Sequence, residues 1–129
     1  MSSLNSITLV VDDYDRAIEY FCGALGFTLL EDTDMGHGKR WVVISPEVGN
    51  GASLLIAKAT SDSQIASIGN QTGGRVAFFL HTDNFDADYS KMIAKGINFI
   101  EEPRLESYGK VVVFKDLFGN KWDFIGRTA

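Results

Sequence analysis

Apolar side chains recur along the chain with two different periods. In residues 6–11, every second side chain is apolar, at Ile7, Leu9 and Val11, and Ser6 and Thr8 between them are polar, which predicts a strand with one packed face. The residues after Asp12 and Asp13 instead carry apolar side chains three and four positions apart, which predicts a helix that ends before Gly26. The buried stripe of this helix is expected to consist of Ile18, Phe21, Cys22 and Leu25.

Short segments typical of strands follow this helix and are separated by residues that favour turns. They predict strands at about 27–32, 40–45 and 52–57, so the first half of the chain has the order βαβββ. Residues 58–74 are rich in Ser, Thr, Gln, Asn and Gly around isolated Ile65 and Ile68. This composition predicts a linker with at most a weak helical turn.

The second half of the chain repeats this order. Residues 76–80 predict a strand, Asp83 and Asn84 suit the start of a helix, and Gly96 suits its end. The apolar stripe of this helix is Phe85, Tyr89, Met92 and Ile93. Further strands are expected near residues 98–101, 110–114 and 121–125. The repetition favours a duplicated α+β domain over residues 1–129, with module 1 at about 5–57, a linker at about 58–74 and module 2 at about 75–127.

The last two strands are joined by a predicted turn at residues 116–120. In the final strand, Trp122 and Phe124 alternate with Asp123, so the two aromatic side chains are expected to pack under a helix. The Asp123 carboxylate then faces either solvent or a cleft on the concave face of the sheet. The strand pattern alone leaves both orientations open.

Composition narrows the range of partners. The 129 residues include 12 Lys and Arg against 17 Asp and Glu, for a net charge of -5, and the basic residues are scattered. Nucleic acid is therefore an unfavourable partner, because phosphate binding needs a clustered basic face. No membrane segment is expected, because no apolar run approaches the roughly 20 residues of a membrane span. The single Cys22 and an N-terminus without signal-peptide features lead us to expect a cytoplasmic protein.

Three features of the sequence together resemble one known family. They are the paired βαβββ order, the segment 11–21 leading to Leu25-Gly26-Phe27, and the closing segment 116–125. These features resemble the vicinal oxygen chelate superfamily, which includes glyoxalases, bleomycin resistance proteins and extradiol dioxygenases. The resemblance covers essentially the whole chain and implies two modules whose curved mixed sheets surround a cleft. It does not name a reaction, because this scaffold hosts isomerases, dioxygenases, thiol transferases and non-catalytic drug binders.

Metal-dependent members of this family place metal ligands on the first and last strands of both modules. The resemblance assigns these positions to Ser6, Leu55, Ala77 and Asp123. A divalent ion needs three or more convergent donors, and of these side chains only Asp123 offers a carboxylate. We therefore expect no metal site and no cofactor.

The candidate ligand contacts lie on the predicted inner face of the sheets and beside it. Such a face suits an apolar or aromatic molecule that carries a polar group. The candidate ligand-binding residues are Thr8, Trp41, Leu55, Ala77, Phe79, Tyr108 and Asp123. Asp123 is also the candidate catalytic residue, as a general base. Tyr108 suits either a cleft wall or an ordinary surface position.

The histidines and two arginines leave alternatives open. His37 lies between glycines in a turn, where exposure to solvent is expected. His81 ends a strand and is either a proton carrier at the cleft rim or simply exposed. Arg40 and Arg75 either receive an anionic substrate group or are solvated.

These observations favour a metal-free small-molecule binding protein of the glyoxalase and bleomycin resistance type. The alternative is a glyoxalase-like lyase or dioxygenase-like enzyme with a non-standard site, and a purely structural interaction module is a third interpretation. Each half is a four-stranded sheet with open edges, so a homodimer is expected, formed through sheet edges or by exchange of modules.

Overall fold

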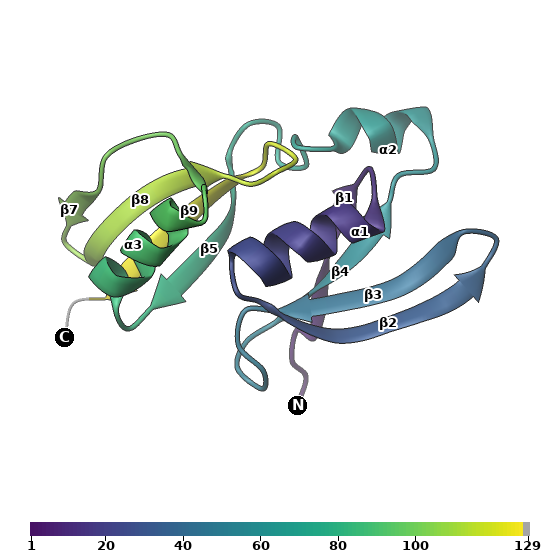
Figure 1. Cartoon of the computed structure of the whole chain (residues 1–129), viewed down its shortest axis with the longest axis horizontal. Coiled ribbons are helices and arrows are strands. Elements are labelled where there is room, and N and C mark those ends of the chain that lie inside the picture. The colour runs from purple at the N-terminus through teal and green to yellow at the C-terminus, as the bar shows by residue number, and fades with distance from the viewer. Residues whose placement is uncertain (128–129) are drawn as a thin grey trace. The chain divides into compact units, whose positions relative to one another are not determined.

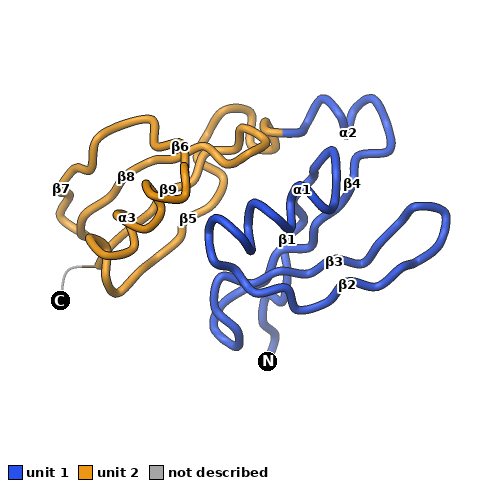
Figure 2. The backbone as a smooth tube through the Cα atoms, viewed as in Figure 1, with its two compact units in different colours: residues 1–68 blue, residues 69–129 orange. Residues whose placement is uncertain are grey.

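A computed structural model describes residues 1–127 of the chain. The chain folds into two compact units that divide after Ile68 (Figure 2). Each unit contains one mixed sheet, in which parallel and antiparallel neighbours occur together, and at least one helix. The prediction of an α+β fold is therefore confirmed.

Unit 1 contains a four-stranded sheet with the order β1-β4-β3-β2. β1 and β4 run parallel, and the other neighbours are antiparallel. Its elements are β1 (Ser6–Val11), α1 (Tyr14–Ile18), the π-helix η1 (Glu19–Ala24), β2 (Thr28–Gly36), β3 (Lys39–Ser45), β4 (Ser53–Lys58) and α2 (Asp62–Ser67) (Figure 1).

Unit 2 repeats this order with one added strand. Its sheet has the order β5-β9-β8-β6, and β7 also pairs with β8. The elements are β5 (Val76–Thr82), α3 (Phe85–Ala94), β6 (Asn98–Phe99), β7 (Arg104–Glu106), β8 (Gly109–Lys115) and β9 (Lys121–Arg127) (Figure 1). The sequence did not predict β7, because a three-residue Arg-Leu-Glu segment has no strand pattern of its own and depends on pairing with β8.

In the described part of the chain, no helix is long and apolar enough to cross a membrane.

The first helix begins as predicted, but its later turns differ. Asp13 is the N-cap, and its side chain accepts a hydrogen bond from the backbone N–H of Arg16. From Glu19 the helix widens to the π form, in which the N–H of Leu25 donates to the carbonyl of Tyr20 at 3.1 Å. The change of period shifts the buried stripe. Phe21 is buried as predicted, but Ile18, Cys22 and Leu25 are half-buried, and Tyr14 and Ala17 complete the buried face.

The remaining differences concern the lengths of two strands, a helix in the predicted linker and one exposed side chain. β2 continues to Gly36, so the predicted turn narrows around His37, which has a φ of 55°. The predicted linker contains the helix α2, because Ser61 supplies an N-cap that the overall polar composition did not indicate. β6 covers only residues 98–99, and Ile93 is exposed on α3 instead of joining its buried stripe.

A single buried carboxylate holds the turn between β8 and β9. Oδ1 of Asp116 accepts hydrogen bonds from the backbone N–H groups of Phe118, Gly119 and Asn120 at 2.9 to 3.0 Å. Oδ2 accepts from Nε1 of Trp122 at 2.9 Å. This network fixes the predicted turn at residues 116–120 and the register of the strand that follows it.

Candidate functional site

Strand β9 separates side chains that face α3 from side chains on the other side of the sheet. Phe124 contacts Phe85 of α3 with ring centroids 5.3 Å apart, and Trp122 stacks on Phe114 at 5.7 Å. Trp122 and Phe124 therefore face the aromatic core, and Asp123 between them points to the opposite side. We call this side, opposite α3, the reverse face of unit 2.

Phe79 and Asp123 are neighbours on the reverse face. The pairing of β5 with β9 places Phe79 beside Asp123, and the pairing of β8 with β9 places Val113 on the other side of Asp123. Phe79 is 63% exposed, although it is a large apolar side chain on a strand. Ala77 is half-buried at an irregularity in the β5 register, so strand alternation does not determine its direction.

The Asp123 carboxylate has an unsatisfied acceptor. Its Oδ1 atom is buried and has no hydrogen-bond partner. Burial raises the pKa of Asp123, and the nearby Arg104 guanidinium opposes this rise only in part. Buried polar atoms in folded proteins are nearly always hydrogen-bonded, so Oδ1 is a position where a donor is missing.

Beside Asp123 lies a charged cluster that the sequence did not reveal. Arg104 donates from Nε to Oε1 of Glu101 at 3.3 Å and from Nη1 to Oε1 of Glu106 at 2.5 Å. The same Glu101 oxygen accepts the backbone N–H of Val113 at 3.0 Å. Glu106 and Tyr108 raise the pKa of Arg104 above its usual value. Alternating charges are visible in the sequence here, but only the pairing of β7 with β8 brings them to the reverse face.

Tyr108 and His81 are both exposed. Tyr108 lies between β7 and β8, next to the Arg104 cluster. His81 pairs with Ile125 of β9, and its Nδ1 accepts a hydrogen bond from Nε of Arg127 at 3.2 Å.

The predicted contacts in unit 1 share one side of its sheet. Strand pairing places four residues in one row: Thr8, Leu55, Val43 and Glu31. Their neighbours Leu9, Ile56 and Val42 are buried on the opposite side. Trp41 lies two residues before Val43 on β3, so it shares the side of the row, and it is exposed. Thr8, Leu55 and Trp41 are therefore brought to one surface of unit 1.

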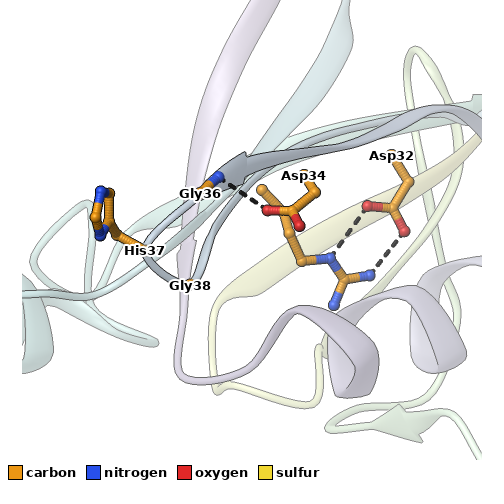
Figure 3. A pocket seen from close by; sticks show the side chains of 6 residues that line it. Asp32, Asp34, Gly36, His37 and Gly38 are labelled. Atoms are coloured by element: carbon orange, nitrogen blue, oxygen red, sulfur yellow. Dashed lines mark hydrogen bonds and ion pairs between the residues drawn. The ribbon is translucent and has the colours of Figure 1, made fainter.

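A shallow hollow of about 470 Å³ lies at the end of the β2–β3 hairpin (Figure 3). It is lined by Asp32, Asp34, Gly36, His37, Gly38 and Arg40. Arg40 donates to both oxygens of Asp32 at 3.1 and 2.7 Å and to Asp15 at 2.9 Å. Its guanidinium carbon also lies 5.1 Å from the ring centroid of Tyr14. Since these internal partners occupy the Arg40 donors, the hollow does not support Arg40 as a receptor for an anionic group.

The four positions that the resemblance assigns to metal ligands do not fit a metal ion in this chain. Ser6, Leu55 and Ala77 provide neither carboxylate nor imidazole, which leaves Asp123 as the one strong donor among the four. Within residues 1–127, no three or more His, Cys, Asp and Glu side chains form a group that could hold a metal ion. The donor set therefore gives no basis for metal chemistry at these positions.

Comparison with known proteins places the chain in a family. The model of the Glyoxalase/Bleomycin resistance protein/Dioxygenase superfamily matches residues 3–124. A protein of Shewanella frigidimarina (strain NCIMB 400) is 50% identical over 124 residues, which are 95% of this chain and 92% of that protein. YetH of Bacillus subtilis (strain 168) is 23% identical over 93% of this chain and 94% of YetH.

Solved structures show the same fold. UcmS2 matches with a TM-score of 0.83 and 24% identity, over 97% of this chain and 98% of UcmS2. TnmS3, an antibiotic binding protein from Streptomyces sp. CB03234, matches with a TM-score of 0.79 and 23% identity, over 99% of this chain and 98% of TnmS3. The predicted glyoxalase-type fold is thus confirmed, and the chain belongs to the Glyoxalase/Bleomycin resistance protein/Dioxygenase superfamily.

Proposed function

We propose that this protein binds a small organic molecule on the reverse face of unit 2 and needs no metal ion to do so. The observation that carries the proposal is the buried Oδ1 of Asp123, which has no hydrogen-bond partner and lies beside the exposed ring of Phe79. A polar acceptor next to an apolar surface is the usual composition of a small-molecule site.

The energetics of both groups favour a bound ligand. A buried acceptor without a donor costs roughly 1–3 kcal/mol, and a ligand that supplies the donor recovers this energy. Covering an exposed phenylalanine ring adds about 1.5–3 kcal/mol when the ring becomes fully buried. Both gains come from one molecule, because Phe79 and Asp123 are paired across adjacent strands.

The relatives support a binding function. TnmS3 is described as an antibiotic binding protein, and it shares the fold along nearly the whole chain. We extend the proposed site to Ala77 and Tyr108 in unit 2. The predicted contacts Thr8, Trp41 and Leu55 in unit 1 stay predictions, as does the cytoplasmic location.

One observation favours the second candidate function, a glyoxalase-like lyase or dioxygenase-like enzyme with a non-standard site. Burial raises the pKa of Asp123, and a carboxylate with a raised pKa is a better general base at neutral pH. In that case Asp123→Asn abolishes turnover. In a binding protein, the same substitution weakens affinity and leaves no reaction to lose.

Asp123→Asn should weaken ligand binding by roughly 1–3 kcal/mol, because an amide replaces a charged acceptor. Folding should be nearly unchanged, since no hydrogen bond to Oδ1 is lost. The measurement is a fragment library screened against ¹⁵N-labelled protein, with amide shifts expected to cluster on Phe79, Val113 and Asp123. Asp83→Asn is the matched control, because Asp83 is exposed and the charge change is the same. Equal affinities of Asp123→Asn and wild type, or shifts confined to other surfaces, would contradict the proposed site.

The protein should form a homodimer in solution. β2 is an edge strand of unit 1, all nine of its residues are exposed, and exposed sheet edges are usually paired or covered. Multi-angle light scattering should give the mass of two chains at micromolar concentrations. A single-chain mass at every workable concentration would remove this prediction without affecting the ligand site in unit 2.

A further inference from the structure

We propose that the ligand of the reverse face carries a positively charged nitrogen attached to a flat apolar body. This inference rests on the proposed function and specifies the chemical class of the ligand. The reverse face offers a buried oxygen that needs a donor, two glutamates beside it that share one guanidinium, and an exposed aromatic ring one strand away.

The hydrogen bonds of Arg104 leave the carboxylates beside it only partly neutralised. Arg104 is the cation that acts on Asp123, but its Nε and Nη1 atoms donate to Glu101 and Glu106. One guanidinium therefore balances two glutamates, and the buried Oδ1 of Asp123 still lacks a donor. A ligand nitrogen that bears both a proton and a positive charge satisfies the hydrogen bond and the charge together.

The other charged groups on the reverse face do not fill this role. His81 and Arg127 bind each other through the hydrogen bond from Nε of Arg127 to Nδ1 of His81. Both lie at the end of the sheet beyond Asp123, because His81 pairs with Ile125, two residues after Asp123 on β9.

Lys115 and Lys121 pair with each other and also lie on the reverse face, because each is two residues from Val113 or Asp123. Nζ of Lys121 donates to the carbonyl of Gly74 at 3.2 Å, and the charges that act on Asp123 are those of Arg104 and Glu101. The need for a cation therefore comes from the cluster around Asp123, in which three carboxylates, of Asp123, Glu101 and Glu106, share one guanidinium, of Arg104.

Phe79 explains why the cation should carry an apolar body. Its ring is 63% exposed and directly beside Asp123 in the strand pairing. An aromatic ring stacks on a flat apolar group, and its face also attracts a cation that lies within about 6 Å of the centroid. A neutral hydroxyl group supplies a donor but no charge, and an anionic carboxylate supplies neither a donor nor a positive charge to Oδ1 of Asp123. The expected order of affinity is therefore ammonium, then alcohol, then carboxylate.

The test uses three probes of similar size: 2-phenylethylammonium, 2-phenylethanol and phenylacetate. Each is titrated into the ¹⁵N-labelled protein at neutral pH and physiological salt, and amide shifts on the reverse face report binding. The ammonium probe should bind about tenfold tighter than the alcohol, a difference of about 1.4 kcal/mol, and phenylacetate should bind most weakly. Asp123→Asn should remove most of the ammonium preference, and the matched Asp83→Asn variant should keep it. Phe79→Ala should weaken the ammonium and alcohol probes alike.

The outcomes separate this inference from the proposed function. Equal binding of the ammonium and alcohol probes on the reverse face overturns the cationic ligand and leaves the binding site standing. If Asp123→Asn still prefers the ammonium probe over the alcohol, the inference of a cationic ligand at Asp123 is also overturned. The preference then comes from the net negative charge of the whole protein. The absence of shifts on this face with all three probes overturns the inference. The proposed function fails as well only if the fragment library also finds nothing there.

Discussion

Replacing Asp116 with alanine should lower the free energy of unfolding by about 3 kcal/mol, because the change leaves several buried donors without an acceptor. Asp116 is only 5% exposed. Its two oxygens accept hydrogen bonds from the backbone N–H groups of Phe118, Gly119 and Asn120 and from the indole N–H of Trp122. Water reaches these donors poorly once the carboxylate is removed, so their desolvation is no longer compensated.

Asp116→Asn separates the contributions of shape and charge. The side-chain oxygen of asparagine can still accept hydrogen bonds from the turn. In the wild type, Oδ2 of Asp116 accepts hydrogen bonds from the side chains of Trp122 and Asn120. In the variant, an NH₂ group replaces Oδ2 and places donor against donor. Burial raises the pKa of Asp116, so part of the wild-type interaction energy already offsets desolvation. We therefore expect a loss smaller than that of alanine. Urea denaturation measures both variants, and an alanine variant as stable as the wild type would show that the turn does not depend on this carboxylate.

Gly69→Ala should destabilise unit 2 by about 3 kcal/mol or more, through a backbone clash at the same turn. Gly69 has a φ of +73°, and a Cβ atom added there would lie 2.0 Å from the carbonyl oxygen of Phe118. Real Cβ atoms do not approach a backbone oxygen so closely, so the 116–120 turn or the chain at residue 69 must move. Either movement disturbs the entry into β9.

Gly73→Ala is the matched control for this clash. Gly73 has a similar φ of +68°, but an added Cβ atom would have nothing within 4 Å. Alanine there should cost about 1 kcal/mol, the penalty of a left-handed backbone alone. Thermal unfolding of both variants isolates the contact with Phe118. Equal losses of stability in Gly69→Ala and Gly73→Ala would show that the 116–120 turn can shift away from the added Cβ atom at little energetic cost.

Local patterns predicted most of the fold because the elements depend on near neighbours. Alternation marked β1 and β9, β-branched and aromatic residues marked β8, and acidic or amide residues marked the helix starts at Asp13 and Asn84. The missed features depend on distant pairing or on unusual helical geometry. β7 exists through its ladder with β8, and the π-helix from Glu19 has no distinct apolar period in the sequence.

In the candidate site, too, the sequence predicted a feature that depends on one strand and missed a feature that depends on contacts between segments. The order Trp122, Asp123, Phe124 was enough to predict that Asp123 turns away from α3, because alternation fixes direction within one strand. The unpaired state of its Oδ1 was not predictable. It depends on Arg104 binding Glu101 and Glu106, and the pairing of β7 with β8 brings these residues to the face of Asp123.

Native mass spectrometry combined with elemental analysis, on protein purified from its own host, tests the central claim most directly. We predict an organic molecule bound to the folded chain and no stoichiometric Ni, Zn, Fe or Mn, because Ser6, Leu55 and Ala77 cannot complete a ligand set with Asp123. The organic mass should be depleted in Asp123→Asn and retained in Asp83→Asn. One divalent metal ion per chain, lost in Asp123→Asn, would contradict the account.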